Sequence, residues 1–298
     1  MKVLVTGASG QLGAELCTQL ATGISPLGAI PAEFHGANVL AADLDSLDIT
    51  DRKAVRALMS SEQPDIVFNC AAMTQVDLCE TELDAAMRAN AIGPRNMAES
   101  CAETGALLLH VSTDYVFSGE GSVPYAEWDT CAPASIYGKS KRLGEEYVCA
   151  SGCRHAIIRT AWLYGRTGHN FVRTMQKAGR ERDTIRVVND QRGNPTNASD
   201  LAWHMLCLAA AGETGIFHIT GNGECSWYEF AREIMRLSGL ACEVLPCTSA
   251  EYPSAVKRPT YSALSHGMLR VTIGDRMRPW REALADFLHD HSPEGKNG

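Results

Sequence analysis

The stretch KVLVTGASGQLG, residues 2–13, decides the fold. Its first part, KVLVT, is typical of a strand that is buried on both faces of a parallel sheet. Gly7, Gly10 and Gly13 follow, and QLGAELCTQLA, 11–21, has the periodicity of an amphipathic helix. Small residues let the backbone approach a pyrophosphate, and the helix N-terminus offers free N–H groups to its charge. The stretch therefore predicts a dinucleotide site, with a glycine-rich turn that holds no ligand as the alternative.

The alternation of a predicted strand with a predicted helix continues along the chain. Helical patterns at 50–62, with Thr50 as N-cap, and at 83–105, bent near Pro94, alternate with short apolar runs. The runs predict strands at 2–6, 38–43, 65–72, 107–113, 155–160, 185–190 and 215–221. Strands that alternate with helices predict an α/β fold with a Rossmann-type, doubly wound parallel sheet.

The C-terminal third differs in composition and in the length of its predicted elements, with more Pro, Trp and Tyr and with shorter helices and strands. We predict one integrated domain in which residues 1–165, with returns of the chain in 185–221, form the NAD(P)-binding Rossmann portion. Residues 166–298 are then mainly a smaller substrate-binding lobe. The segment 22–37 is read as an added loop, and the last six residues, PEGKNG, are predicted to be disordered.

Composition narrows the function classes. The 298 residues carry a formal charge of −8, which disfavours nucleic acid and anionic membranes as partners. No signal peptide and no run of 18 apolar residues is seen, so no membrane span is expected. Eleven cysteines are scattered without metal-ligand spacing, which indicates free thiols in a reducing cytosol rather than zinc ligands. The predicted location is cytoplasmic.

An acid at the end of the second long strand is a candidate for the cofactor ribose. Asp43 ends the run NVLAAD, and its carboxylate could accept hydroxyl groups and repel a 2′-phosphate. It lies thirty residues after Gly13, more than is usual, because 22–37 intervenes. A solvated acid at a strand end is the alternative. Asp48 and Ile49, in the next turn, are of the type that flanks an adenine.

A phenol and an ammonium stand one helical turn apart in ASIYGKSKRLGEE. Tyr137 and Lys141 are spaced i and i+4, so they share one helix face. A phenol has a pKa near 10, and a nearby ammonium is expected to lower it toward neutral pH. Ser112, Thr113 and Asp114 end the fourth strand, where open parallel sheets hold ligands. This set predicts reduction of a carbonyl, with Tyr137 as proton donor; a surface pair and a strand-end cap are the alternatives.

Taken together, these motifs resemble the dTDP-4-dehydrorhamnose reductases, a branch of the extended short-chain dehydrogenase/reductases. The matching segments run almost from end to end and include TGASGQLG, PDIVFNCAAMTQVD, NAIGPRNMAE, VSTDYVFSG, YGKSKRLGEE, VVNDQRGNPT, SWYEFA and RPTYSAL. The resemblance implies reduction of the C4 ketone of dTDP-4-dehydro-β-L-rhamnose by NADH or NADPH, the last step of dTDP-L-rhamnose synthesis.

The resemblance also implies residue roles. The cofactor would be held by Gly7, Gly10, Gln11, Leu12, Gly13, Asp43, Asp48, Ile49, Ala72, Met73, Thr74, Tyr137 and Lys141. The catalytic residues would be Thr113, Tyr137 and Lys141. The nucleotide-sugar would meet Thr113, Asp114, Tyr137, Trp162, Asn170 and Arg258, with Ser262 as a further candidate. The alternatives are a core residue for Trp162 and a surface charge for Arg258.

Several alternatives stay open. Some relatives of this type form homodimers around Mg²⁺; Glu15 matches one acidic position, but Ser199 stands where a second glutamate is expected, which disfavours the metal. The substrate could be another dTDP-4-keto-6-deoxyhexose. An epimerase or dehydratase is disfavoured because Asp114-Tyr115 does not provide an Asp-Glu pair. A non-catalytic regulatory subunit on this scaffold is disfavoured by the intact Thr113, Tyr137 and Lys141.

Overall fold

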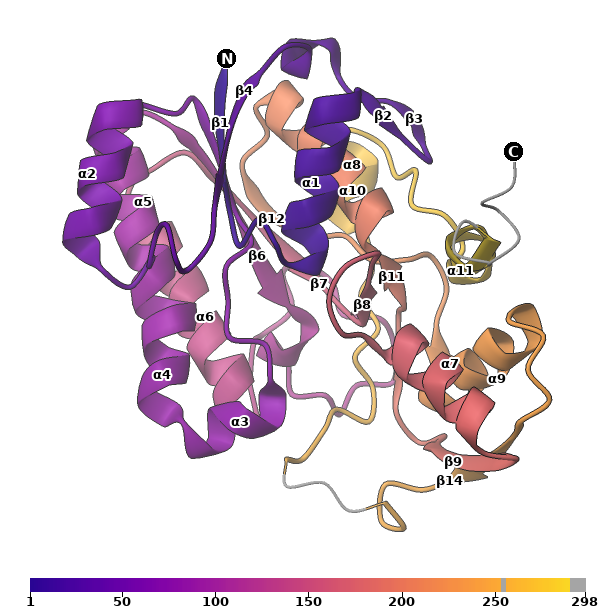
Figure 1. Ribbon diagram of the computed structural model, residues 1–298. Helices are drawn as coiled ribbons and strands as arrows, with labels where there is room; N and C mark the ends of the chain where they lie inside the picture. Colours follow the sequence, from indigo (N-terminus) through magenta and orange to yellow (C-terminus); the bar gives the residue numbers. More distant parts are fainter. Residues whose placement is uncertain (253–255, 290–298) are drawn as a thin grey trace.

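The computed structural model describes residues 1–252 and 256–289 (Figure 1). The tail predicted to be disordered, 293–298, lies outside the described residues. The centre is a parallel sheet of six strands in the order β12-β7-β6-β5-β1-β4. Their bounds are β1 Lys2–Thr6, β4 Asn38–Ala42, β5 Ile66–Asn69, β6 Leu107–Thr113, β7 His155–Thr160 and β12 Gly215–His218. The order reverses between β1 and β5, and such a switch point is where α/β sheets bind ligands.

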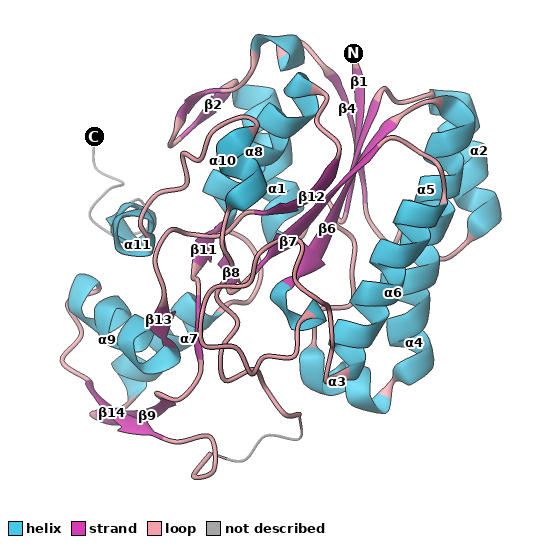
Figure 2. Cartoon of the chain, turned by 180° about the vertical axis from the view of Figure 1, so that it is seen from behind, coloured by secondary structure: helices cyan, strands magenta, loops and turns pink. Residues whose placement is uncertain are grey.

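Helices cover both faces of this sheet (Figure 2). One layer holds α1 and α8, and the other holds α2, α5 and α6 (Figure 1). The helices of this portion are α1 Gln11–Thr22, α2 Arg52–Glu62, α3 Val76–Thr81, α4 Leu83–Met87, the π-helical turn η2 Arg88–Ile92, α5 Gly93–Thr104, the 3₁₀ turn η3 Asp114–Val116, α6 Ile136–Ala150, α8 Ala198–Ala211 and α10 Gly267–Val271. The doubly wound Rossmann-type fold is confirmed.

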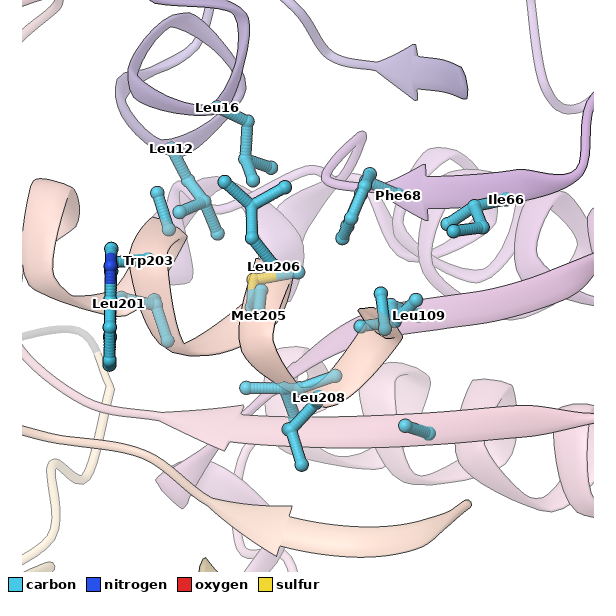
Figure 3. Close-up of a cluster of buried hydrophobic side chains, with 14 of the residues drawn as sticks. Leu12, Leu16, Ile66, Phe68, Leu109, Leu201, Trp203, Met205, Leu206 and Leu208 are labelled. Atoms are coloured by element: carbon cyan, nitrogen blue, oxygen red, sulfur yellow. The ribbon is translucent and has the colours of Figure 1, made fainter. Parts of the chain in front are cut away.

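Alternation along the strands builds a separate core on each face. Val3 and Val5 of β1 are fully buried in the layer of α1 and α8, whereas Leu4 is buried beneath α2 and α5. In the first core, Leu12 and Leu16 of α1 face side chains of α8 and of the strands (Figure 3). Because both faces are buried, the strands are nearly continuous apolar runs, which is why the sequence revealed them.

A smaller lobe packs beside the carboxyl edge of the sheet and contains α7 Phe171–Glu181, α9 Trp227–Leu237 and α11 Trp280–His289 (Figure 1). Its strands form two-residue pairings of β8 Leu163–Tyr164 with β11 Thr196–Asn197 and of β10 Arg192–Gly193 with β13 Cys225–Ser226, and a longer pairing of β9 Thr184–Val188 with β14 Glu243–Cys247. The range 185–221 implied that the strand predicted at 185–190 joins the central sheet, but this strand, β9, pairs with β14 in the lobe. Within that range, α8 and β12 are the elements that belong to the Rossmann portion. The division of roles at residue 165 stays a prediction.

The predicted N-cap of the helix at 50–62 needs correction. Asp51, not Thr50, caps α2, because its carboxylate accepts the N–H groups of Lys53 and Ala54. The helix predicted at 83–105, with a bend near Pro94, is continuous, and the π-helical turn η2 joins α4 to α5 just before Pro94. Pro94 lies in the first turn of α5, where its missing N–H removes no hydrogen bond of the regular helix.

The segment 22–37 is folded rather than a plain loop. It forms β2 Ile24–Ser25, β3 Gly28–Ala29 and the 3₁₀ turn η1 Ala32–Phe34. Ile30 and Phe34 are buried in the core beside α1 and α8, and Trp203 donates its indole N–H to the Ala29 carbonyl oxygen at 3.0 Å. The insertion thus extends the core at the edge of that helical layer.

Among residues 1–252 and 256–289, no helix is long and apolar enough to cross a membrane.

Candidate functional site

A cavity of about 730 Å³ opens where the central strands end, on the carboxyl edge of the sheet. Its lining combines the glycine-rich turn, the ends of β4, β5, β6 and β7, the start of α6, and Trp227 of the lobe. Of the predicted site residues, those in its lining are Gly7, Gly10, Gln11, Leu12, Gly13, Asp43, Asp48, Ile49, Ala72, Met73, Thr74, Thr113, Asp114, Tyr137, Lys141 and Trp162.

The glycine-rich turn has no room for side chains. Gly7 has a φ of +63°, and a Cβ there would lie 2.8 Å from the amide nitrogen of Ala71. A Cβ at Gly13 would lie 2.1 Å from the Gly7 carbonyl oxygen. The turn is thus closed against both β5 and the start of α1, and it presents the helix N-terminus to the cavity. Such a cradle fits the pyrophosphate of a dinucleotide.

Gly13→Ala should weaken NADPH binding by roughly tenfold or more, about 1.4 kcal/mol, because the added methyl group pushes the Gly7 carbonyl out of the turn. A titration of NADPH fluorescence measures the dissociation constant. Thr18→Ala, at an exposed position of the same helix, is the control for a general effect on α1. An unchanged dissociation constant in Gly13→Ala would contradict the role of this turn.

The acids near the turn hold backbone in place. Both Asp43 carboxylate oxygens accept the Ser9 N–H, at 3.2 and 3.0 Å, so this strand-end acid is tied to the glycine-rich turn. Asp48 accepts the N–H of Thr50 at 2.8 Å, and the buried Ile49 packs where a side chain on Gly93 would lie. Asp43 borders the cavity, next to the end of β1. Its contact with the cofactor ribose stays a prediction.

Asn90 fixes the segment after β5. Its side chain accepts the N–H of Met73 at 2.9 Å and donates to the Met73 carbonyl oxygen at 3.0 Å, which aligns residues 72–74 along the cavity. It also donates to the Ser140 hydroxyl at 3.1 Å, and so connects the π-helical turn to α6. No role was predicted for Asn90, although it lies in the quoted segment NAIGPRNMAE.

The three predicted catalytic side chains meet at one end of the cavity. Thr113 ends β6, and its hydroxyl donates to the Asp114 carboxylate at 2.9 Å and accepts the Tyr115 N–H at 3.2 Å. Tyr137 and Lys141 lie one turn apart in α6, both buried, and the Tyr137 phenol lies near the Thr113 hydroxyl. The Lys141 ammonium donates to the Val111 carbonyl oxygen at 2.6 Å.

The expected lowering of the phenol pKa does not occur. Burial raises the pKa of Tyr137 above its ordinary value, and the hydrogen bond with Thr113 opposes this only in part. Burial also lowers the pKa of Lys141 to about 8, and its ammonium is engaged by Val111. A phenol that stays protonated at neutral pH suits a proton donor, which is the role that a reduction requires.

Asp114 is a buried acid beside the catalytic group. Burial raises its pKa to about 6, against the opposing effect of the nearby Ser262 and Thr113 hydroxyls. Among the described residues, its Oδ2 atom has no hydrogen-bond partner. A buried carboxylate oxygen without a partner costs free energy, and a hydroxyl of a bound sugar would satisfy it.

Trp162 belongs to the cavity wall and not to a closed core. Its backbone has a φ of +46°, a strained conformation for a bulky residue. Its ring stacks on Trp227 of α9 with 3.5 Å between centroids and 7° between planes. A Cβ at Gly193 would lie 2.7 Å from the Trp162 indole, so Gly193 makes room for it. Trp227 was missed from the sequence, where SWYEFA reads as an ordinary helix start.

Two predicted substrate residues lie away from the main cavity. Asn170 caps α7 by accepting the Arg173 N–H, and its amide donates to Gln11 and to the Gly165 carbonyl oxygen, each at 3.0 Å. Arg258 forms an ion pair with Asp77 at 2.9 Å. It lines a smaller adjoining cavity with Lys257, and this cavity shares Tyr115 with the main one. A direct contact of Asn170 or Arg258 with substrate stays a prediction.

The residues considered for Mg²⁺ are engaged otherwise. Glu15 is buried with Arg166 at 3.9 Å, and Ser199 accepts the Gln19 amide at 3.0 Å. Within residues 1–252 and 256–289, no group of three or more His, Cys, Asp or Glu could hold a metal ion.

A Rossmann-type sheet whose carboxyl edge gathers a threonine, a tyrosine and a lysine beside a glycine-rich cradle defines the class of the short-chain dehydrogenase/reductases. Within it, the chain belongs to the family described as the RmlD substrate binding domain, whose model matches residues 1–292. The resemblance seen in the sequence is confirmed.

Relatives cover nearly the whole chain. The spore coat polysaccharide biosynthesis protein SpsK of Bacillus subtilis (strain 168) is 46% identical, over 98% of each chain. The crystal structure of a dTDP-4-dehydrorhamnose reductase from Clostridium acetobutylicum ATCC 824 has 44% identity and a TM-score of 0.92, and covers 97% of this chain and 99% of its own. The dTDP-4-dehydrorhamnose reductase of Bacillus anthracis str. Ames, in complex with NADP, has 39% identity, a TM-score of 0.90 and the same coverage.

Proposed function

We propose that this protein reduces the C4 ketone of dTDP-4-dehydro-β-L-rhamnose to give dTDP-L-rhamnose, with NADH or NADPH as cofactor. The observation that carries the proposal is the meeting of Thr113, Tyr137 and Lys141 at the cavity that the glycine-rich cradle borders. The substrate and NADP named for the solved relatives support the choice of sugar and cofactor.

The residues of the chain divide the chemistry. When bound, NAD(P)H supplies a hydride, the two electrons that convert the ketone carbon into an alkoxide. Tyr137 breaks its O–H bond and gives that proton to the alkoxide oxygen. The Thr113 hydroxyl, which donates to Asp114 without substrate, turns to donate its hydrogen bond to the same alkoxide oxygen. Lys141 stabilises the phenolate that Tyr137 becomes. Asp114 accepts a sugar hydroxyl and so orients the ring, because its Oδ2 atom is otherwise without a described partner.

The direct test follows absorbance at 340 nm with NADH or NADPH and with dTDP-4-dehydro-β-L-rhamnose generated in place. We expect oxidation that requires the sugar, and the two cofactors are ranked by kcat/KM. Parallel reactions with other dTDP-4-keto-6-deoxyhexoses define the substrate. Higher kcat/KM with one of these would replace the proposed sugar, and no oxidation with any of them, by a chain that binds NADPH, would contradict the reductase activity itself.

We also propose that the protein acts in the cytoplasm, because a nucleotide-sugar and NAD(P)H are the reactants of the proposed reaction. A homodimer stays a prediction.

A further inference from the structure

Glu145 lies at the junction of the elements that carry the catalytic side chains. It is in α6, one turn after Lys141, and its side chain is fully buried. Its Oε1 atom accepts the Ser112 hydroxyl at 2.6 Å and the Arg159 Nε–H at 2.9 Å. Its Oε2 atom accepts from Arg159 Nη2 at 2.8 Å and from Arg142 Nη1 at 2.9 Å. Both carboxylate oxygens are therefore fully used within the protein.

Two of the three partners of this carboxylate, Ser112 and Arg159, are next to a part of the site. Ser112 precedes Thr113 at the end of β6. Arg159 is the second-to-last residue of β7, just before Thr160, which lines the cavity. The helix that carries Glu145 also carries Tyr137 and Lys141. One buried charge thus joins α6 to the ends of two neighbouring strands.

We propose that Glu145 is a positioning residue of the reductase site, which holds α6 in register with β6 and β7 and keeps the Lys141 ammonium charged. The inference rests on the proposed function. It assigns a role to a side chain that touches neither the cavity nor the reacting atoms.

The groups around Lys141 support the electrostatic part. Its ammonium donates to the Val111 carbonyl oxygen. Cys70, which follows β5, is also near Lys141, and because burial raises its thiol pKa it carries no charge at neutral pH. Burial lowers the pKa of His110 on β6, so this histidine is a neutral neighbour. Among these groups Glu145 carries the negative charge, and that charge opposes the lowering of the Lys141 pKa by burial.

The groups around Glu145 keep it ionised. Burial acts to raise the pKa of Glu145, but the hydrogen bonds and charges of Arg159, Ser112 and Arg142 outweigh burial and leave it below the ordinary value. The next residue, Glu146, is half exposed and pairs with Arg142 at 3.2 Å. Cys131, near Arg159, has a thiol pKa raised by burial and adds no charge at neutral pH.

The test compares wild type with Glu145→Gln in two measurements. The first is NADPH affinity between pH 6 and 10, without sugar, from the fluorescence of the bound nucleotide. We expect wild-type affinity to decline as the pH passes about 8, and the decline of Glu145→Gln to begin at least roughly half a pH unit lower. The second is kcat with the sugar, which should fall roughly 10- to 100-fold because α6 is no longer held in register.

Two further variants separate charge from register. Glu146→Gln, which changes the adjacent exposed carboxylate, should match wild type in both measurements. Glu145→Asp keeps the charge with a shorter reach, so its pH dependence should return to that of wild type while kcat stays low. Wild-type kcat and pH dependence in Glu145→Gln, with only a lower melting temperature, would overturn the proposal. Failure of wild type to oxidise NADPH would instead contradict the reductase function, and the binding measurement would still test the charge.

Discussion

Tyr137→Phe is expected to lower kcat by about 10²- to 10⁴-fold, because it removes the proton that the alkoxide receives. The fold should persist, since the change deletes one hydroxyl and leaves the buried ring that packs edge-on against Tyr115. Thr113 keeps its hydrogen bonds with Asp114 and Tyr115. The measurement is single-turnover oxidation of NADPH at saturating sugar, so that product release does not hide the chemical step.

The effect should also be specific to chemistry. NADPH affinity of Tyr137→Phe is expected to stay within a few-fold of wild type, because the glycine-rich cradle is unchanged. Tyr115→Phe is the matched control: its ring is next to Tyr137, and its phenol lies toward Arg258 and the smaller cavity. A kcat loss in Tyr115→Phe as large as in Tyr137→Phe would show that the loss is not specific to the Tyr137 hydroxyl, and an unchanged kcat in Tyr137→Phe would show that another group is the proton donor.

The sequence predicted those elements whose burial appears as a local pattern of apolar residues. β6 and β7 were predicted at their observed bounds, 107–113 and 155–160, because continuous apolar runs are what a doubly covered parallel strand requires. The strand β9 was found in the sequence but wrongly assigned to the Rossmann portion, because its partner β14 is more than fifty residues away in the chain. Pairing at that distance depends on the packing of α7 and α9, which no local pattern encodes.

The site divides in the same way. Thr113 could be predicted because it ends a strand at the carboxyl edge of the sheet. Tyr137 and Lys141 could be predicted as a pair because one helix turn fixes their relative position. Burial could not be read from that spacing, so the sequence suggested a lowered Tyr137 pKa where the structure gives a raised one. Asn90 and Glu145 were missed for a related reason: each acts by joining segments that lie far apart in the sequence.

Arg159→Ala is expected to destabilise the protein by about 3–5 kcal/mol, because it leaves the buried Glu145 carboxylate without its main counter-charge. Arg159 is itself almost wholly buried, with its guanidinium over the Phe117 ring at 5.1 Å, so the change also leaves a void. Equilibrium unfolding in urea, followed by tryptophan fluorescence and by circular dichroism, gives the free energy of unfolding where the two probes agree. Arg142→Ala removes a partly exposed contact to the same carboxylate and should cost no more than about 1 kcal/mol.

The pH dependence of the unfolding free energy tests whether loss of the ion pair between Arg159 and Glu145 causes the destabilisation of Arg159→Ala. The pKa of Glu145 is lower in the folded protein than in the unfolded chain, where it is about 4.3, so the pair stabilises the fold above that value. That contribution is lost as the pH falls through the folded pKa of Glu145, because protonation removes the charge that Arg159 binds. The difference in unfolding free energy between wild type and Arg159→Ala should therefore be constant near neutral pH and shrink at acid pH, toward the part due to the void. A difference that does not change with pH would assign the whole effect to packing, and Glu145 would then contribute no electrostatic stability through Arg159.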